Sequence, residues 1–252
     1  MKAPPVVLIF SAFDGTGGAG LLADCRAAAA AGGLPLAVAA ALTAQNLDGV
    51  SARWNVPPAR VLAQFAALRA KPLAVKIGVI GNPAAVAACL ESLDGNIPAV
   101  WDPVLTPTGG APFADAAQIR LLKKHILPRA FIVTPNRAEL SALSGSGEVA
   151  EGARRLREAG ARFVLATDVG GGAEVRHELY AAGANPVWRA RCRRRRGAFH
   201  GSGCFFSSVL AARLAAGDSP PKAAARAHRM TLAAIDRALS IPALGRQRLL
   251  RV

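Results

Sequence analysis

Residues 6–20 read VVLIFSAFDGTGGAG, an apolar run that passes directly into a glycine-rich turn. The run Val6–Ser11 has the length of a buried strand, and the Ala-rich stretch Gly18–Ala31 has the spacing of a helix. A strand, a glycine loop and a helix at the start of a chain are typical of α/β proteins. We therefore expect the same alternation further along the chain.

The expected alternation continues beyond this first unit. Further apolar runs of strand length lie at Pro35–Leu42, Ala74–Val79, Ala99–Asp102, Phe131–Thr134 and Arg162–Ala166, with weaker edge strands at Glu174–Tyr180 and Pro186–Arg191. Helical spacing is found over Pro57–Ala70, Pro83–Leu93, Ala116–Leu127, Val149–Ala159, Gly203–Ala216 and Pro220–Leu239. Because crossover helices bury such strands on both faces, we predict a three-layer α/β/α sandwich with a mostly parallel sheet, formed by residues 1–252 as one domain. The short basic segment from Ile241 is expected to be frayed.

The composition is that of a protein with a large buried core. Hydrophobic residues make up 52% of the 252 residues, and no apolar stretch reaches the length of about 18 residues that a membrane span needs. No secretory signal is recognisable, so we expect a cytoplasmic protein without a membrane partner. The four cysteines form no CxxC pair, which argues against a disulfide framework and a zinc site.

The formal net charge of +15 is unevenly distributed, with arginines concentrated at Arg189, Arg191 and Arg193–Arg196. Such a run is most often a solvated loop, but it also suits a clamp on nucleotide phosphates or a nonspecific nucleic-acid patch. Charge alone does not choose between these three, and we rank nucleic acid last.

The turn after the first strand contains the GxGxxG spacing of a dinucleotide-binding loop, at Gly15, Gly17 and Gly20. An acid that binds ribose is expected about 20 residues further on, yet no Asp or Glu occurs from Cys25 to Leu47. An NAD enzyme is therefore disfavoured. The glycines, Gly18 included, still allow a ligand to approach backbone N–H groups, beside Asp14 and Asp24. The plainer alternative is that Asp14 stabilises the turn and Asp24 faces solvent.

Polar side chains follow several strands at the carboxyl edge of the predicted sheet, where open α/β proteins bind ligands. The Gln45 amide can donate and accept, as recognition of an aminopyrimidine or pyridine edge requires, although a plain loop glutamine fits equally. Asp102 and Glu139 are candidates to bind Mg²⁺ beside a triphosphate. Pro135 and Glu139 also match ordinary helix-start chemistry.

Residues 200–204, His-Gly-Ser-Gly-Cys, open a helix. Unpaired N–H groups at a helix start attract anions, and Gly201, Ser202 and Gly203 allow a transferring phosphoryl group to come close. Cys204 in that first turn would have its thiolate form favoured, which makes it a candidate base for a substrate hydroxyl. A tight turn in which Cys204 packs into the core is an equally good interpretation of these residues.

In their order along the chain, these segments resemble the hydroxymethylpyrimidine/phosphomethylpyrimidine kinases, a branch of the ribokinase-like superfamily that includes pyridoxal kinases. The segments that carry the resemblance are Ser11–Gly20 with Asp24, Thr43–Asn46, Val75–Gly78, Asp102–Val104, Thr134–Glu139 and Gly201–Cys204. The resemblance implies transfer of the γ-phosphate of ATP, with Mg²⁺, to the hydroxymethyl group of a small pyrimidine in thiamine biosynthesis, and then to the monophosphate. It also suggests a homodimer.

The resemblance assigns a role to each motif. It makes Cys204 the base and Gly201-Ser202-Gly203 the anion hole. The residues implied to hold the pyrimidine are Gln45, Asp24, Asp14 and the Gly17–Gly20 turn, with Val79 and Val104 flanking the ring. Those implied at ATP and Mg²⁺ are Asp102, Asn136, Glu139, Thr167 and Asp168. A pyridoxal kinase-like activity, or a weakened relative that senses a ligand or associates with nucleic acid, is the alternative.

The chain departs from the family pattern in four places. Val79 replaces a usual methionine, and Ser202 replaces a usual threonine. Ala166–Gly170 lacks the usual lysine near the ATP phosphates, and its loss should weaken stabilisation of the transferring charge. The arginine run lies on the segment that approaches nucleotide in the family. We hypothesise that one of Arg193–Arg196 replaces the lost lysine.

Overall fold

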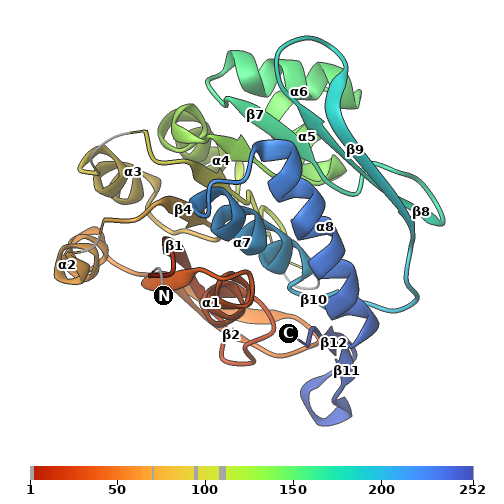
Figure 1. The fold of residues 1–252 in the computed structure, drawn as a ribbon. Coiled ribbons are helices and arrows are strands. Elements are labelled where there is room, and N and C mark those ends of the chain that lie inside the picture. Colours follow the sequence, from red (N-terminus) through yellow and green to blue (C-terminus); the bar gives the residue numbers. More distant parts are fainter. Residues whose placement is uncertain (1–2, 70, 94–95, 108–111, 252) are drawn as a thin grey trace.

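A nine-stranded sheet forms the centre of the computed structural model, which describes residues 3–69, 71–93, 96–107 and 112–251 (Figure 1). The strand order is β3-β2-β1-β4-β5-β6-β7-β8-β9. Pairing is parallel from β2 to β7 and antiparallel at β3, β8 and β9, as expected of a mostly parallel sheet. The strands are β1 Val6–Phe13, β2 Leu34–Gln45, β3 Val50–Asn55, β4 Ala74–Ile77, β5 Ala99–Trp101, β6 Ile132–Val133, β7 Phe163–Ala166, β8 Glu174–Tyr180 and β9 Pro186–Arg193.

Helices cover both faces of this sheet, so the predicted three-layer α/β/α sandwich is confirmed (Figure 1). One face carries α1 Gly20–Ala30, α7 Ser202–Ala215 and α8 Pro220–Asp236. The other carries α2 Pro58–Leu68, α3 Pro83–Glu91, α4 Ala116–His125, the 3-10 turn η1 Leu127–Arg129, α5 Arg137–Ser144 and α6 Val149–Glu158. No helix within the described ranges has both the length and the apolar character to cross a membrane.

Strand β1 shows why its sequence is apolar at consecutive positions. Val7 and Ile9 lie in the core beneath α1, α7 and α8, whereas Leu8 and Phe10 lie in the core of the opposite face. Successive side chains of a strand point to opposite faces, so a sheet covered on both faces needs an unbroken apolar run. The apolar run Val6–Ser11 therefore contributes side chains to both cores.

Several element boundaries differ from the sequence prediction. Strand β2 runs three residues beyond Leu42, to Gln45, and forms an antiparallel ribbon with the unpredicted strand β3. Helix α5 was not predicted as an element, although its starting signals were recognised. The predicted helix Pro57–Ala70 is observed as α2, and Ala70 lies outside the described residues.

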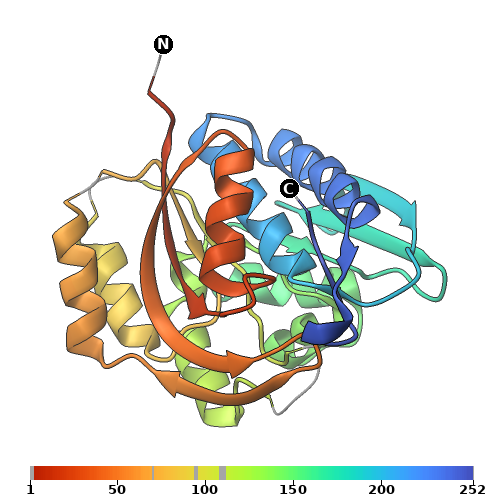
Figure 2. The ribbon, with the colours of Figure 1, turned by 90° about the horizontal axis from the view of Figure 1, so that it is seen from below.

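The expectation that the chain frays from Ile241 is wrong. A small second sheet joins β10 Phe199–His200, β11 Leu239–Ser240 and β12 Arg248–Leu249, and the 3-10 turn η2 spans Pro242–Leu244. The Leu47 N–H donates to the Leu244 carbonyl at 2.8 Å, which ties this segment to the end of the β2–β3 ribbon (Figure 2). The burial of Leu250 and the backbone pairing of β12 with β10 offset the conformational entropy that the basic chain end loses on folding. The composition of the segment does not reveal these contacts.

Substitution of Leu250 tests whether this segment belongs to the folded core. Leu250 is 8% exposed and packs in the cluster beneath α1 and α7, so Leu250→Ala should lower the free energy of unfolding by about 2 kcal/mol. The matched control is Leu244→Ala, because Leu244 is 39% exposed; it should change stability by less than about 0.5 kcal/mol. Urea denaturation measures both, and equal effects of the two substitutions would contradict the observed packing.

Candidate active site

Two glycine turns meet at the carboxyl edge of the parallel strands. A Cβ atom at Gly201, where φ is +77°, would overlap the carbonyl oxygen of Gly18. A Cβ atom at Gly18 would in turn overlap His200 and Leu249. Only glycine permits this approach, so the turn after β1 and the start of α7 form one backbone surface. The structure thus brings together the two segments assigned to substrate binding and to the anion hole.

Asp14 holds these two turns to each other. Its carboxylate accepts hydrogen bonds from the Thr16 and Ala19 N–H groups, at 2.8 and 2.9 Å, and lies 2.8 Å from the ring nitrogen Nε2 of His200. Burial alone would raise the pKa of Asp14, but its hydrogen bonds with His200, Thr16 and Ala19 lower it. Asp14 is fully buried, in the turn-stabilising role that the sequence left open as the alternative.

A buried ion pair lies beneath the turns. Lys76 Nζ, on β4, contacts the Asp24 carboxylate of α1 at 2.7 Å, and neither side chain has exposed surface. The other Asp24 oxygen accepts from Ser208 of α7 at 2.8 Å. The alternative that Asp24 faces solvent is wrong, because its side chain has no exposed surface; its contact with the pyrimidine stays a prediction. Its carboxylate is used inside the protein.

Cys204 lies in the first turn of α7, close to this ion pair, and is half-buried. Burial raises the pKa of its thiol to about 12; Lys76 lowers it, while Asp24 and Asp102 raise it further. The thiol form is therefore favoured, contrary to the expectation that the start of the helix favours the thiolate. Desolvation, Asp24 and Asp102 outweigh Lys76 and a hydrogen bond with the Gly20 backbone, and these neighbours come from segments far apart in the sequence.

Two carboxylates lie beyond the ends of β5 and β6: Asp102 follows β5 directly, and Glu139 is in the first turn of α5. Asp102 accepts from Ser207 at 3.1 Å and is 5% exposed, and burial raises its pKa. Glu139 forms a capping box with Asn136 at the start of α5: the Asn136 N–H donates to Glu139 at 2.9 Å, and the Asn136 side chain accepts from the Glu139 N–H at 3.0 Å. The helix-start interpretation of this segment is confirmed.

The same carboxylates can be tested as a cation site. Burial, and then the charge of Asp102, raise the pKa of Glu139 to about 8. The two carboxylates therefore repel each other electrostatically in a poorly solvated space. Among the described residues, no three His, Cys, Asp or Glu side chains are grouped to enclose a metal. Mg²⁺ commonly takes one or two carboxylates and completes its shell with water and phosphate oxygens, so Asp102 and Glu139 fit Mg²⁺ bound together with a nucleotide.

The residues assigned to nucleotide also lie side by side. Asn136 and Thr167 form a parallel bridge between the ends of β6 and β7. The next residue, Asp168, has φ of +48° and accepts two bonds from Arg194, at 2.6 and 2.9 Å. Arg194 of the arginine run thus lies at the loop Ala166–Gly170, where it pairs with Asp168, and the replacement of the lysine stays a prediction.

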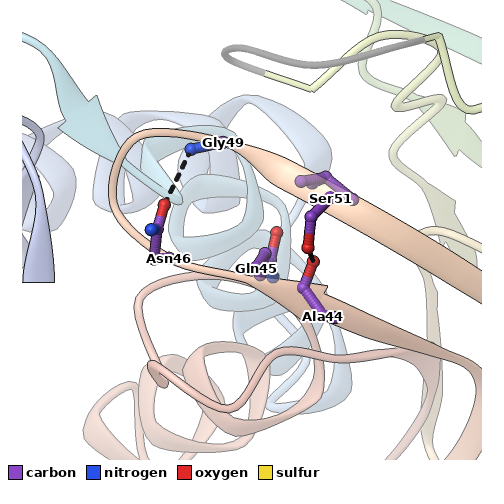
Figure 3. Close-up of a pocket in the computed structure, with 6 residues that line it drawn as sticks. Ala44, Gln45, Asn46, Gly49 and Ser51 are labelled. Atoms are coloured by element: carbon purple, nitrogen blue, oxygen red, sulfur yellow. Dashed lines mark hydrogen bonds between the residues drawn. The ribbon is translucent and has the colours of Figure 1, made fainter.

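The predicted substrate residues line two separate hollows. Val79 and Val104 line one cavity together, next to Trp101 and Arg53. Gln45 lines a different, open hollow on the β2–β3 ribbon, where Asn46 accepts from the Gly49 N–H and Ser51 donates to the Ala44 carbonyl (Figure 3). The structure thus joins the two valines and leaves Gln45 on the neighbouring ribbon.

Sequence reasoning missed four side chains of this region: Lys76, His200, Ser207 and Ser208. All four occur in or next to motifs that were recognised, but no role was drawn from their residue types. A lysine inside the apolar run 74–79 was an available signal, because an unpaired lysine does not stay buried in a sheet. The two serines gave no signal beyond their helical spacing.

Comparison with known proteins agrees with this geometry. A family model described as phosphomethylpyrimidine kinase matches residues 14–246. A thiamine biosynthesis bifunctional protein of Geobacter sulfurreducens is 37% identical over 243 residues, which is 91% of this chain and 49% of that protein. A hydroxymethylpyrimidine/phosphomethylpyrimidine kinase of Streptomyces coelicolor is 31% identical over 242 residues, or 92% of this chain and 89% of that one. The chain thus spans about half the length of the bifunctional relative.

A solved structure shows the same fold. The pyridoxal kinase from Staphylococcus aureus, in complex with pyridoxal, superposes with a TM-score of 0.85 and covers 99% of this chain and 94% of its own. Its sequence identity is 23%, so this likeness extends to the ribokinase-like fold and no further.

The raised pKa of Glu139 predicts how stability depends on pH. The folded-state value of about 8 exceeds the ordinary value of 4.5, so the folded protein retains this proton where the unfolded chain releases it. Stability should therefore fall as pH rises between these values, by at most about 1.4 kcal/mol per pH unit for this group. Glu139→Gln preserves a capping box and should flatten that decline.

Urea unfolding at several pH values from about 5 to about 8 measures the effect. The free energy of unfolding of the wild type should decline more steeply with pH than that of Glu139→Gln. Parallel curves for the two proteins would contradict the buried, proton-retaining state of Glu139.

Proposed function

Because the chain belongs to the phosphomethylpyrimidine kinase family, we propose that it transfers the γ-phosphate of ATP to the hydroxymethyl group of 4-amino-5-hydroxymethyl-2-methylpyrimidine, and then phosphorylates the monophosphate. The observation that carries this proposal is the contact of Gly18 with Gly201. This contact joins the glycine turn after β1 to the start of α7. Cys204 lies in the first turn of α7, and Lys76 acts on it electrostatically. Thiamine biosynthesis is the setting that the relatives' names support.

The start of α7 supplies the site for the transferring phosphoryl group. The N–H groups of the first turn have no partners within the helix, and they carry the positive end of its dipole. Gly201 and Gly203 leave the backbone accessible, and a Cβ at Gly203 would find Asp102 as its nearest neighbour, at 3.9 Å. Preorganised donors of this kind stabilise the charge that develops during phosphoryl transfer.

Cys204 is the proposed acceptor of the hydroxyl proton. Burial raises the pKa of its thiol, and the nearby charges show what must change for it to act. Lys76 already favours the thiolate, whereas Asp102 disfavours it. Mg²⁺ held by Asp102 and Glu139 would offset their charge, draw in the ATP phosphates and lower the pKa of Cys204. Asn136 and Thr167 would then border the nucleotide, and Val79 and Val104 the ring.

A side-by-side assay tests the activity. With ATP and Mg²⁺, the protein should consume ATP when given the hydroxymethylpyrimidine or its monophosphate, and much less when given pyridoxal. Preference for pyridoxal would transfer the proposal to the activity of the structural neighbour. Cys204→Ala should lower kcat by about 10²- to 10⁴-fold while the KM for the pyrimidine changes little. Cys192→Ala, a half-buried cysteine on β9, is the control and should keep full turnover.

Arg194 is proposed to supply the cation that the family's lysine provides elsewhere. Arg194→Met should raise the KM for ATP about tenfold, because a charged hydrogen bond to phosphate is lost. Arg195→Met is the matched control, since Arg195 pairs with Asp236 at 2.7 Å and is similarly exposed. Steady-state kinetics with varied ATP distinguish them, and an unchanged KM and kcat in Arg194→Met would overturn the assignment of this role to Arg194.

A further inference from the structure

Arg53 is a charged side chain in the cavity that contains Val79 and Val104. It extends from β3, opposite Thr43 of β2, and lines the cavity with Trp101 and Phe113. Its Nη1 donates to the Phe113 carbonyl at 2.6 Å, and its guanidinium carbon lies 5.6 Å from the centre of the Phe113 ring. These two contacts hold the guanidinium in a defined position within a mostly apolar lining.

No carboxylate neutralises Arg53 within the described ranges. The ion pairs found there do not include it, and one nitrogen donates to a neutral carbonyl, whereas no described residue accepts from the others. Burial lowers its pKa, without any compensating acid among the causes. A half-buried guanidinium with free donors in an apolar cavity is costly for the protein alone and well suited to an anionic ligand.

We propose that Arg53 is a specificity-determining residue that binds the phosphate of the phosphorylated pyrimidine when that monoester lies against Val79 and Val104. This inference rests on the proposed function. Of the ring compounds in that function, the monophosphate is negatively charged and the unphosphorylated pyrimidine is not. ATP is proposed to lie at the ends of β6 and β7 and at α7, so its phosphates have their own donors. Arg53 would thus favour the second phosphorylation over the first.

The test compares the two ring substrates in the full chain. Arg53→Met should raise the KM for the monophosphate about ten- to a hundredfold and change the KM for the pyrimidine less than about twofold. Arg53→Lys keeps a positive charge and should recover part of the loss. The matched control is Arg60→Met, which removes an exposed charge from the neighbouring helix α2 and should behave as wild type.

The outcomes separate this inference from the proposed function. Equal changes in both KM values would show that Arg53 only braces the ribbon against Phe113, and unchanged values would show that it contacts neither substrate; either result overturns the inference. If wild type phosphorylates neither ring compound, the proposed function fails. The affinity for the monophosphate, measured by calorimetry without ATP, then tests the role of Arg53. Weaker binding by Arg53→Met than by wild type supports the inference, and equal binding by the two proteins overturns it.

Two further measurements keep the result specific. Inorganic phosphate should bind far more weakly than the monophosphate, because the cavity also contacts the ring; equal affinities would overturn recognition of the monoester. Thermal melting checks that Arg53→Met is folded. If that variant is unfolded, Arg53→Lys carries the test, and a KM for the monophosphate that moves together with the KM for the pyrimidine would again overturn the inference.

Discussion

The arrangement of the candidate active site depends on the buried ion pair between Lys76 and Asp24. Two charges without exposed surface are expensive to bury, and they remain favourable only with close geometry and satisfied hydrogen bonds. Ser208 supplies one such bond from α7, and Gly78 leaves space, because a Cβ atom there would lie 2.6 Å from the lysine Nζ. The pair therefore fixes β4, α1 and α7 relative to one another, and with them the start of α7.

This ion pair also leaves an electrostatic imbalance at the sheet edge. Lys76 is one positive charge, whereas Asp24 and Asp102 both act on the same region and Glu139 lies within reach of Asp102. Burial, and then the excess of acid, accounts for the raised pKa values of Asp102, Glu139 and Cys204. A site of this kind favours arrival of a cation or retention of protons. The proposed chemistry needs the first, and the raised pKa values correspond to the second.

The sequence predicted the fold well because the decisive signals are local. Continuous apolar strands such as Val6–Ser11 and helices of regular spacing follow from burial on two faces, and glycines at 17–20 and 201–203 mark turns that need missing side chains. The positions of Asp102 and of the segment Thr134–Glu139 beyond strand ends also followed, since parallel strands end at one edge. The burial of Asp24, the raised pKa of Cys204 and the packing of β12 did not follow, because each depends on contacts between segments far apart in the chain. The homodimer stays a prediction.

The arginines show why net charge alone does not identify a binding partner: their role depends on where they lie in the fold. A net charge of +15 suggested a nucleic-acid surface as one option, yet three of the six arginines in the run pair with acids of this chain: Arg189 pairs with Glu178, Arg194 with Asp168 and Arg195 with Asp236. These pairs tie β9 and the segment after it to β8, to the loop after β7 and to the end of α8. Arg53, by contrast, lies far from the run in sequence and has no acid partner among the described residues. The charge of Arg53 is therefore left for a group that the described chain itself does not supply.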